Sequence, residues 1–189
     1  MNARRRRAAT QFMPVMPILF TLLVGLPAAE AQSNRPDFSG VWELDQERSD
    51  DAVRAIRDAL GQTGGRGERQ IERQALSSRL SYLARAAGTI EIEQTEKDIK
   101  LFNSEDDVRI HYIDGEKHPR QSPGGEQMTT VTEWRGTFLD LTTEGPDIGK
   151  VTETLGIEGA RLVHIVRIQN SAFEKDLVVR AYYNRAEDK

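Results

Sequence analysis

Apolar and polar residues alternate with a period of two along most of the second half of the chain, and this pattern predicts β-strands. Turn-forming residues separate the runs, and Asp114-Gly115 is the strongest hairpin signal. The segment 117–127 contains Pro119 and Pro123, so we expect a long loop there. The alternating runs cover residues 89–94, 99–102, 108–113, 129–134, 138–143, 150–157, 161–168 and 176–185.

One further run lies well before these, over residues 37–45. Phe38, Gly40, Trp42 and Leu44 occupy alternate positions, as expected of a half-buried strand around a large aromatic residue. It brings the expected number of strands to about nine.

Between the first strand and the others, over about residues 49–87, the period becomes helical. We expect one helix over 50–60, with Ser49 as its N-cap and two aspartates in its first turn. We expect a second over 69–86, which Gly88 ends. The glycine-rich segment 61–67 lacks the strand and the Lys-Ser or Lys-Thr of a phosphate-binding loop, so it is interpreted as a linker.

The apolar stripe of the second helix predicts where it packs. Its members are Ile71, Ala75, Leu80 and Leu83. The strand 161–168 is apolar on both faces, so we expect this helix to cover its outer face. The arginines of the helix could instead contact a membrane or an acidic partner.

The expected fold class is mainly β. Consecutive antiparallel strands must protect their edges, and closure into an up-and-down barrel is the simplest solution. We therefore predict a barrel of about 8–10 strands with a two-helix insertion after the first strand; an open sandwich is the alternative.

The first 31 residues have the organisation of a secretory signal peptide. A basic start, 2–7, precedes a mostly apolar stretch, 12–26, and Ala29-Glu30-Ala31 predicts cleavage before Gln32. The apolar stretch is interrupted by prolines and is short for a membrane anchor, which is the alternative. We expect a bacterial protein that is periplasmic or secreted, exported by the general or the twin-arginine route. Residues 32–189 would then form a single domain.

Charge and cysteine content narrow the possible partners. The chain has 26 basic and 30 acidic residues, and removal of the leader with its four arginines and one glutamate leaves an acidic excess of about seven. Nucleic acids and anionic membranes select basic faces, so neither is expected as the main partner. The sequence contains no cysteine, which excludes disulfides, thiolate metal sites and a lipid-modified N-terminal cysteine. We expect no stable membrane insertion after cleavage.

The segment Gly40-Val41-Trp42 resembles the G-x-W signature of lipocalins and the wider calycin group. The resemblance implies that Trp42 closes one end of a barrel and that a late arginine packs across its ring. Arg185 at the end of the last strand is the expected partner, with Arg180 as second choice. A guanidinium over an indole gains roughly 0.5 to 2 kcal/mol.

Three segments together are similar to a family of exported bacterial lipocalin-like proteins of unassigned function. They are 37–45, Glu133-Trp134-Arg135-Gly136 and Tyr183-Asn184-Arg185. The helical insertion departs from a plain lipocalin barrel.

No residue pattern predicts an enzyme, a metal site or a cofactor. The three histidines, His111, His118 and His164, lack the spacing of a zinc site, and no G-x-S-x-G nucleophile motif is present. Catalysis would require His111, His164 or a carboxylate to meet in a pocket with perturbed pKa values.

A barrel of this size can hold a small ligand. Six residues are candidates to line an amphipathic pocket: Tyr112, Thr130, Thr132, Trp134, His164 and Tyr183. Alternatively, these side chains fill the barrel. The sequence therefore favours an extracytoplasmic binding protein for a small hydrophobic or amphipathic ligand. The alternative is a non-enzymatic structural or interaction module of the cell envelope, with helices 50–86 as the surface for a protein partner.

Overall fold

The structure is a computed structural model that describes residues 35–61, 68–84, 86–104, 107–121, 125–146 and 148–186. The predicted leader, 1–31, lies outside the described residues. No helix in these segments combines the length and apolar character needed to cross a bilayer.

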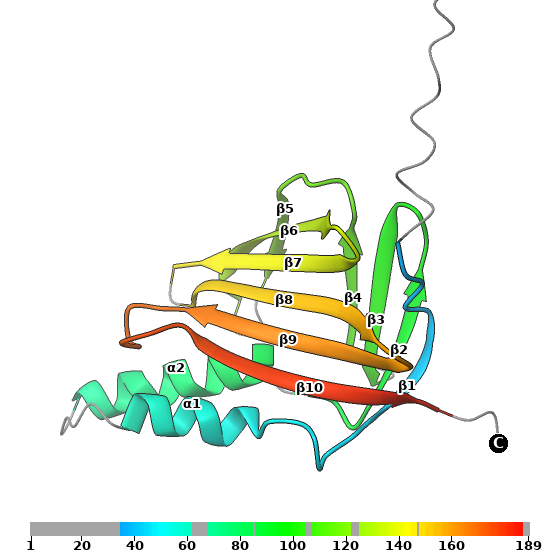
Figure 1. Ribbon diagram of the computed structural model, residues 1–189. Coiled ribbons are helices and arrows are strands. Elements are labelled where there is room, and N and C mark those ends of the chain that lie inside the picture. The colour runs from blue at the N-terminus through cyan, green and yellow to red at the C-terminus, as the bar shows by residue number, and fades with distance from the viewer. Residues whose placement is uncertain are drawn as a thin grey trace, which may run out of the picture. The chain divides into compact units, whose positions relative to one another are not determined.

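The described residues form ten antiparallel strands and two helices (Figure 1). Both helices, α1 (Ala52–Gly61) and α2 (Glu68–Ala84), lie between the first and second strands of the chain. The strands are β1 (Gly40–Leu44), β2 (Thr89–Gln94), β3 (Asp98–Ser104), β4 (Asp107–Tyr112), β5 (His118–Gln121), β6 (Gln127–Arg135), β7 (Phe138–Gly145), β8 (Gly149–Glu158), β9 (Arg161–Gln169) and β10 (Leu177–Arg185).

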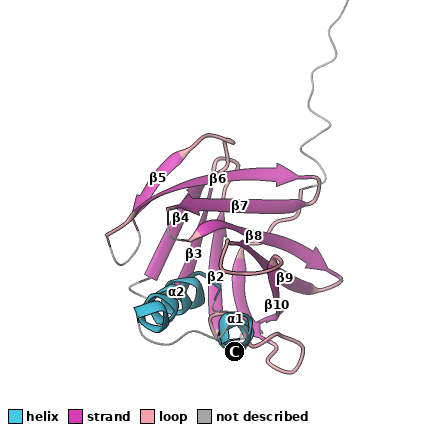
Figure 2. Ribbon diagram, turned by 90° about the vertical axis from the view of Figure 1, so that its left-hand side faces the viewer, coloured by secondary structure: helices cyan, strands magenta, loops and turns pink. Residues whose placement is uncertain are grey.

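The strands form one sheet in the order β4-β3-β2-β1-β10-β9-β8-β7-β6-β5. Neighbours in the sheet are neighbours in the chain, except where β1 pairs with β10. The two edges, β4 and β5, are consecutive strands, and the sheet curls so that they face each other (Figure 2). Just after β4, the amide of Gly115 donates to the carbonyl of Thr132 on β6 at 3.1 Å. The prediction of an up-and-down barrel with a two-helix insertion is confirmed.

Strand β5 lies inside the segment 117–127 that we expected to be a loop. Pro119 occupies the middle of β5 and pairs with Thr129 of β6. Proline lacks the amide that a central strand needs, but an edge strand tolerates it because only one side must be hydrogen-bonded. The proline therefore marks an edge here.

Helix α1 begins slightly later than predicted, because Asp51 and not Ser49 caps it. The Asp51 carboxylate accepts the amide of Arg54 at 3.0 Å, the geometry of an N-cap. Ser49 Oγ instead accepts the amide of Tyr182 at 2.9 Å and donates to the carbonyl of Asp45 at 2.7 Å. Ser49 thus extends the attachment of this segment to β10.

The buried face of α2 differs from the predicted stripe. Leu80 and Ala84 are buried and Leu76 is partly buried, whereas Ala75 is exposed. The side chains of Ile71 and Leu83 lie outside the described ones. Positions 76, 80 and 84 are spaced by four, so they share one face of the helix.

That face packs on one end of the barrel, and the expectation that α2 covers the outer face of β9 is wrong. The helices pack with inward-facing residues at the start of β8, the end of β9 and the start of β10, which lie at the same end of the sheet. We call this cluster the helix-end core. Its buried members are Ala52, Ile56, Leu60, Leu80, Ala84, Met128, Ile148, Val151, Val166, Ile168 and Val179.

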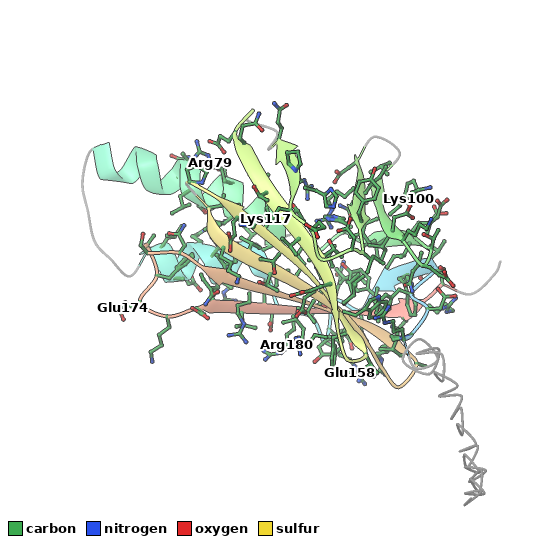
Figure 3. All side chains as sticks on the ribbon, turned by 90° about the horizontal axis from the view of Figure 1, so that it is seen from above. Arg79, Lys100, Lys117, Glu158, Glu174 and Arg180 are labelled. Carbon is green, nitrogen blue, oxygen red and sulfur yellow. The ribbon has the colours of Figure 1, made fainter. Side chains whose placement is uncertain are left out.

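A second apolar cluster fills the opposite end, which we call the closed end. Figure 3 shows Glu174, in the connection between β9 and β10, at the helix side, and Glu158, the last residue of β8, on the other side. The buried members of the closed end are Phe38, Trp42, Ile90, Ile92, Ile99, Leu101, Leu139, Leu141, Leu155, Leu162, Ala181 and Tyr183.

Trp42 is held at the closed end from three sides. It is 2% exposed, and its indole nitrogen donates to the carbonyl of Phe38 at 2.8 Å. The guanidinium carbon of Arg185 lies 4.6 Å from the ring centroid. Gly40 has φ +128°, and a Cβ there would lie 2.7 Å from Nη1 of Arg185. The glycine of the G-x-W segment thus leaves room for the arginine over the tryptophan.

Candidate functional site

Edge strand β4 turns its charged and imidazole side chains inward. Arg109 is partly buried and His111 is 4% exposed, while Val108, Ile110 and Tyr112 are 42%, 54% and 50% exposed. Alternation along a strand places these two sets on opposite faces. The apolar residues of β4 therefore face outward, the reverse of the usual arrangement in a barrel that encloses an apolar core.

A cavity of about 330 Å³ lies between β4 on one side and β5 and β6 on the other. We call this place the seam, since the two edges of the sheet meet there. The cavity is partly open to solvent. It is lined by Val108, Arg109, Ile110, His111, Tyr112, His118, Pro119, Arg120, Thr130 and Thr132.

Behind the cavity, Arg109 forms an ion pair with Glu153 of β8. Nη1 of Arg109 lies 2.8 Å and 2.9 Å from the two carboxylate oxygens. The side chains are 9% and 3% exposed. His164 of β9 adds a contact, with Nε2 3.1 Å from Oε2 of Glu153. Burial alone would raise the pKa of Glu153, but Arg109 and then His164 outweigh it and hold this pKa well below its usual range.

His111 is buried beside this cluster as a neutral ring. Burial lowers its pKa to about 4; Glu153 acts against this shift, while Arg109 and Arg120 add to it. Its Nε2 is buried and has no hydrogen-bond partner among the described residues. An unsatisfied buried polar atom costs about 1 to 3 kcal/mol, so this nitrogen is suited to bond a ligand.

Threonines form the wall opposite β4. Thr130 and Thr132 of β6 are 5% and 1% exposed. The hydroxyl of Thr130 lies 3.1 Å from that of Thr143 on β7. Hydroxyls both donate and accept, so this wall can bond an anionic or a neutral polar group.

The mouth of the cavity has an aromatic rim. The rings of Tyr112 and His118 lie 4.9 Å apart at a tilt of 44°. His118 Nε2 is 3.0 Å from the carboxylate of Asp114, in the turn after β4. Tyr112 was expected to line the interior; it stands at the entrance, because Arg109 and His111 take the inward positions of its strand.

The six predicted pocket residues divide into two groups. Tyr112, Thr130 and Thr132 line the cavity. His164, Trp134 and Tyr183 do not. His164 contacts Glu153, and the Trp134 ring stacks on Phe38 at 5.7 Å. Tyr183 is 1% exposed in the closed end, where burial raises its pKa to about 12.

Sequence reasoning missed Arg109, Arg120 and Glu153. Glu153 carried a usable signal, because it occupies an inward position between Val151 and Leu155 on β8. A charge in an otherwise apolar register must be paired inside the barrel. Arg120 was not recognised as a site residue, because its segment, now β5, was expected to be a loop.

His111, His164 and Glu153 do lie close together, as an enzyme would require. However, both carboxylate oxygens of Glu153 are engaged, and neither Glu153 nor His164 lines the cavity. The contacts of Glu153 with Arg109 and His164 neutralise a buried acid. Among the described side chains, no group of three metal-ligating residues is arranged to hold a metal ion.

No family model matches the chain, and no curated protein matches it. Solved structures do. A structure described as the REP1-NXSQ fatty acid transporter aligns with a TM-score of 0.51 at 17% identity, over 80% of this chain and 97% of that one. The chain has a calycin barrel fold of the fatty-acid-binding-protein type.

Two other solved structures align equally well. Lipid binding protein 8 of Caenorhabditis elegans, in its apo form, has a TM-score of 0.51 at 13% identity, over 79% of this chain and 95% of that one. The wild-type fluorescent protein UnaG has a TM-score of 0.50 at 16% identity, over 79% and 97%. These descriptions name a transporter, a lipid-binding protein and a fluorescent protein, and none names an enzyme.

Proposed function

We propose that the protein is an extracytoplasmic binding protein for a small amphipathic ligand, held in the seam cavity. The observation that carries this proposal is the lining of the cavity. Polar groups that can bond a ligand, His111 and Thr132, lie beside apolar walls from Val108, Ile110 and Pro119. Ligand sites typically combine an apolar wall with a few convergent polar groups, in volumes of about 300 to 1,000 Å³.

Two further observations support the proposal. The aligned structures include a protein named as a fatty acid transporter and one named as a lipid-binding protein, so the same barrel serves amphipathic ligands elsewhere. The sequence of the first 31 residues supports the extracytoplasmic location. The descriptions of the aligned structures name no enzyme, so binding is favoured over catalysis.

Native mass spectrometry of the protein purified gently from its own host tests ligand binding. We expect an added mass of a small amphipathic molecule, which is lost on denaturation. A matched Thr132→Val variant should retain less of it, whereas Val41→Ser, an exposed change on β1, should retain it fully. A mass equal to that of the bare polypeptide, together with no binding of added amphiphiles to the delipidated protein, would contradict the proposal.

The location has its own test. N-terminal sequencing of the protein from the periplasmic or culture fraction should start at Gln32. Recovery of the intact chain only from the cytoplasm would contradict the extracytoplasmic part while leaving ligand binding open to the test above.

A further inference from the structure

Strand β4 is an unprotected edge of the sheet. It pairs with β3 on one side and has no strand partner on the other among the described residues. In an antiparallel ladder, every second residue of such a strand directs its amide and carbonyl away from the neighbouring strand. Edge strands usually prevent further pairing with proline or with charged side chains. Strand β4 contains no proline, and its outward residues Val108, Ile110 and Tyr112 are uncharged. This edge is therefore a template for an added strand.

The facing edge, β5, is protected. Pro119 lies within its four residues and has no amide to donate. Proline on an edge strand is one of the usual means of preventing further pairing. The two edges face each other across the seam (Figure 2), with the seam cavity of about 330 Å³ between them. A strand added in the seam would therefore pair with β4 and lie beside β5.

Exposed apolar side chains are concentrated on this edge. Five large apolar side chains are exposed among the described residues, and three of them are on β4. The other two, Val41 and Val53, lie on β1 and α1. Pro119 of β5 is also exposed, across the seam from β4. Exposed apolar patches mark interaction sites, so the outward side chains of an added strand should be apolar.

The inner face of the seam requires a different kind of side chain. Both arginines of the cavity lining, Arg109 and Arg120, are cationic, and the lining contains no acidic residue. Nε2 of His111 is buried without a hydrogen-bond partner among the described residues. A neutral imidazole with its proton on Nε2 can donate it to a carboxylate, and the hydroxyl of Thr132 is a second donor. Inward side chains of an added strand should therefore be acidic.

We propose that the seam binds a short extended peptide, which adds to β4 as an antiparallel strand with apolar side chains outward and acidic side chains inward. Three apolar residues would lie opposite Val108, Ile110 and Tyr112, and two acidic residues opposite Arg109 and His111. This inference rests on the proposed function and names the ligand class, a peptide of alternating polarity. Main-chain hydrogen bonds to β4 provide affinity, and the two faces provide specificity.

A second copy of β4 suits this edge less well. The antiparallel register that covers both apolar stripes in full would place each Arg109 opposite a His111 of the other copy. Neither side chain would then receive an acidic partner from the added strand. A separate peptide with acidic inward residues satisfies both faces at once.

Synthetic peptides test the inference on the folded protein. The probe is a pentapeptide, blocked at both ends, with the sequence valine-glutamate-valine-glutamate-valine. One control has the same composition in the order valine-valine-glutamate-glutamate-valine, and another has glutamine in place of glutamate. Two further versions carry N-methyl groups, either on the valine amides or on the glutamate amides, because amides of alternate residues point to opposite edges of a strand. Heteronuclear NMR spectra report affinity and the residues contacted.

We expect the alternating peptide to bind at least about tenfold more tightly than the shuffled and glutamine peptides, a difference of about 1.4 kcal/mol. One of the two N-methylated versions should lose a similar factor, because it lacks the donors to β4. Bound peptide should slow hydrogen exchange of alternate amides within 108–112. The variant Ile110→Lys places a charge on the edge and should weaken binding at least about fivefold, whereas Val41→Lys, at another exposed position, should not.

The outcomes separate the inference from the function. Equal binding of the alternating and shuffled peptides, full binding of both N-methylated versions, or unchanged exchange within 108–112 overturns strand addition. Equal binding of the glutamine peptide overturns the acidic preference. A dimer in sedimentation that Ile110→Lys dissociates also overturns the inference, since a second copy would then occupy the edge.

The amphiphile anilinonaphthalene sulfonate serves as the probe of the proposed function. If no peptide binds, but this amphiphile binds and Thr132→Val weakens its binding, the inference falls and the proposed function stands. If neither binds to protein that is folded by circular dichroism, both fall.

Discussion

Arg109 and Glu153, 44 residues apart in the chain, form a buried ion pair that joins β4 to β8 across the inside of the barrel. Strand β4 is hydrogen-bonded to β3 but is an edge of the sheet on its other side. The ion pair therefore fixes an edge strand to the opposite half of the sheet.

Loss of the Arg109–Glu153 ion pair should lower the free energy of unfolding substantially. Arg109→Met leaves the Glu153 carboxylate buried with His164 as its remaining partner among the described residues, and such a change costs roughly 3 to 5 kcal/mol. The double variant Arg109→Met/Glu153→Gln removes both charges and should be less destabilised than the sum of the single variants. Urea denaturation measures all three.

An exposed ion pair of the same chemistry is the control. Arg135, 63% exposed at its side chain, bonds Asp140 at 2.7 Å. Arg135→Met should cost less than about 1 kcal/mol. If Arg109→Met costs no more than Arg135→Met, the buried pair does not anchor β4.

The buried neutral His111 predicts a loss of stability in acid. Its native pKa is about 4, below the ordinary value of 6.5 that it regains on unfolding. As the pH falls below about 6.5, the unfolded chain takes up a proton that the native protein excludes until about pH 4. The free energy of unfolding therefore falls over this window, by up to roughly 3 kcal/mol.

A His111→Gln variant cannot take up that proton, so its free energy of unfolding should vary less between about pH 7 and about pH 4.5. Urea titrations at both pH values make the comparison. Parallel curves for His111→Gln and wild type would show that His111 has the same pKa in the native and the unfolded protein, which would contradict the prediction.

At the closed end, Trp42→Ala should destabilise the protein by roughly 3 to 5 kcal/mol, because a large buried side chain is lost. Arg185→Ala should cost roughly 0.5 to 1 kcal/mol, as expected for a cation over an indole at a surface position. The cost of Arg185→Ala should shrink in the Trp42→Ala background. Arg180→Ala, the other arginine of β10, serves as the control and should show no such coupling to Trp42.

Two turn glycines with nearly the same backbone should respond differently to alanine. Gly149 and Gly159 have φ +70° and +65°, a region that costs a residue with Cβ roughly 1 to 2 kcal/mol. A Cβ at Gly149 would also collide with the carbonyl oxygen of Gln169, whereas at Gly159 nothing lies within 4 Å. Gly149→Ala should therefore lower the thermal midpoint clearly more than Gly159→Ala, and equal midpoints would argue against the close packing of the turn at Gly149.

The fold was largely predictable because period-two alternation and turn residues act locally. The strand at 89–94 follows from Ile90 and Ile92, which the structure buries at 2% exposure each. The G-x-W segment pointed to a barrel end, where Trp42 now lies beneath Arg185. Strand β5 escaped prediction because the effect of Pro119 depends on whether its strand is at an edge, and edge position is a property of the whole sheet.

The candidate site was less predictable, because it depends on which face of β4 turns inward. Hydrophobicity alone would bury Val108 and Ile110, yet these are exposed and Arg109 and His111 are enclosed. The deciding interaction is the ion pair with Glu153, which lies on β8, 44 residues further along the chain and six places away in the order of the sheet. Pairing of charges across a barrel cannot be derived from strand periodicity.

The neighbouring positions of β1 and β10 have a consequence for the order of the chain. The amide of Ala186 donates to the carbonyl of Val41 at 2.9 Å, so the end of β10 lies beside the start of β1. A circular permutant that links these two ends and opens the chain within 113–117 would have its termini at β4 and β5. The order of strands along the chain would then match their order in the sheet, and the longest-range pairing would become local. Such a permutant should fold faster than the natural chain, since contact order falls while the native contacts stay the same.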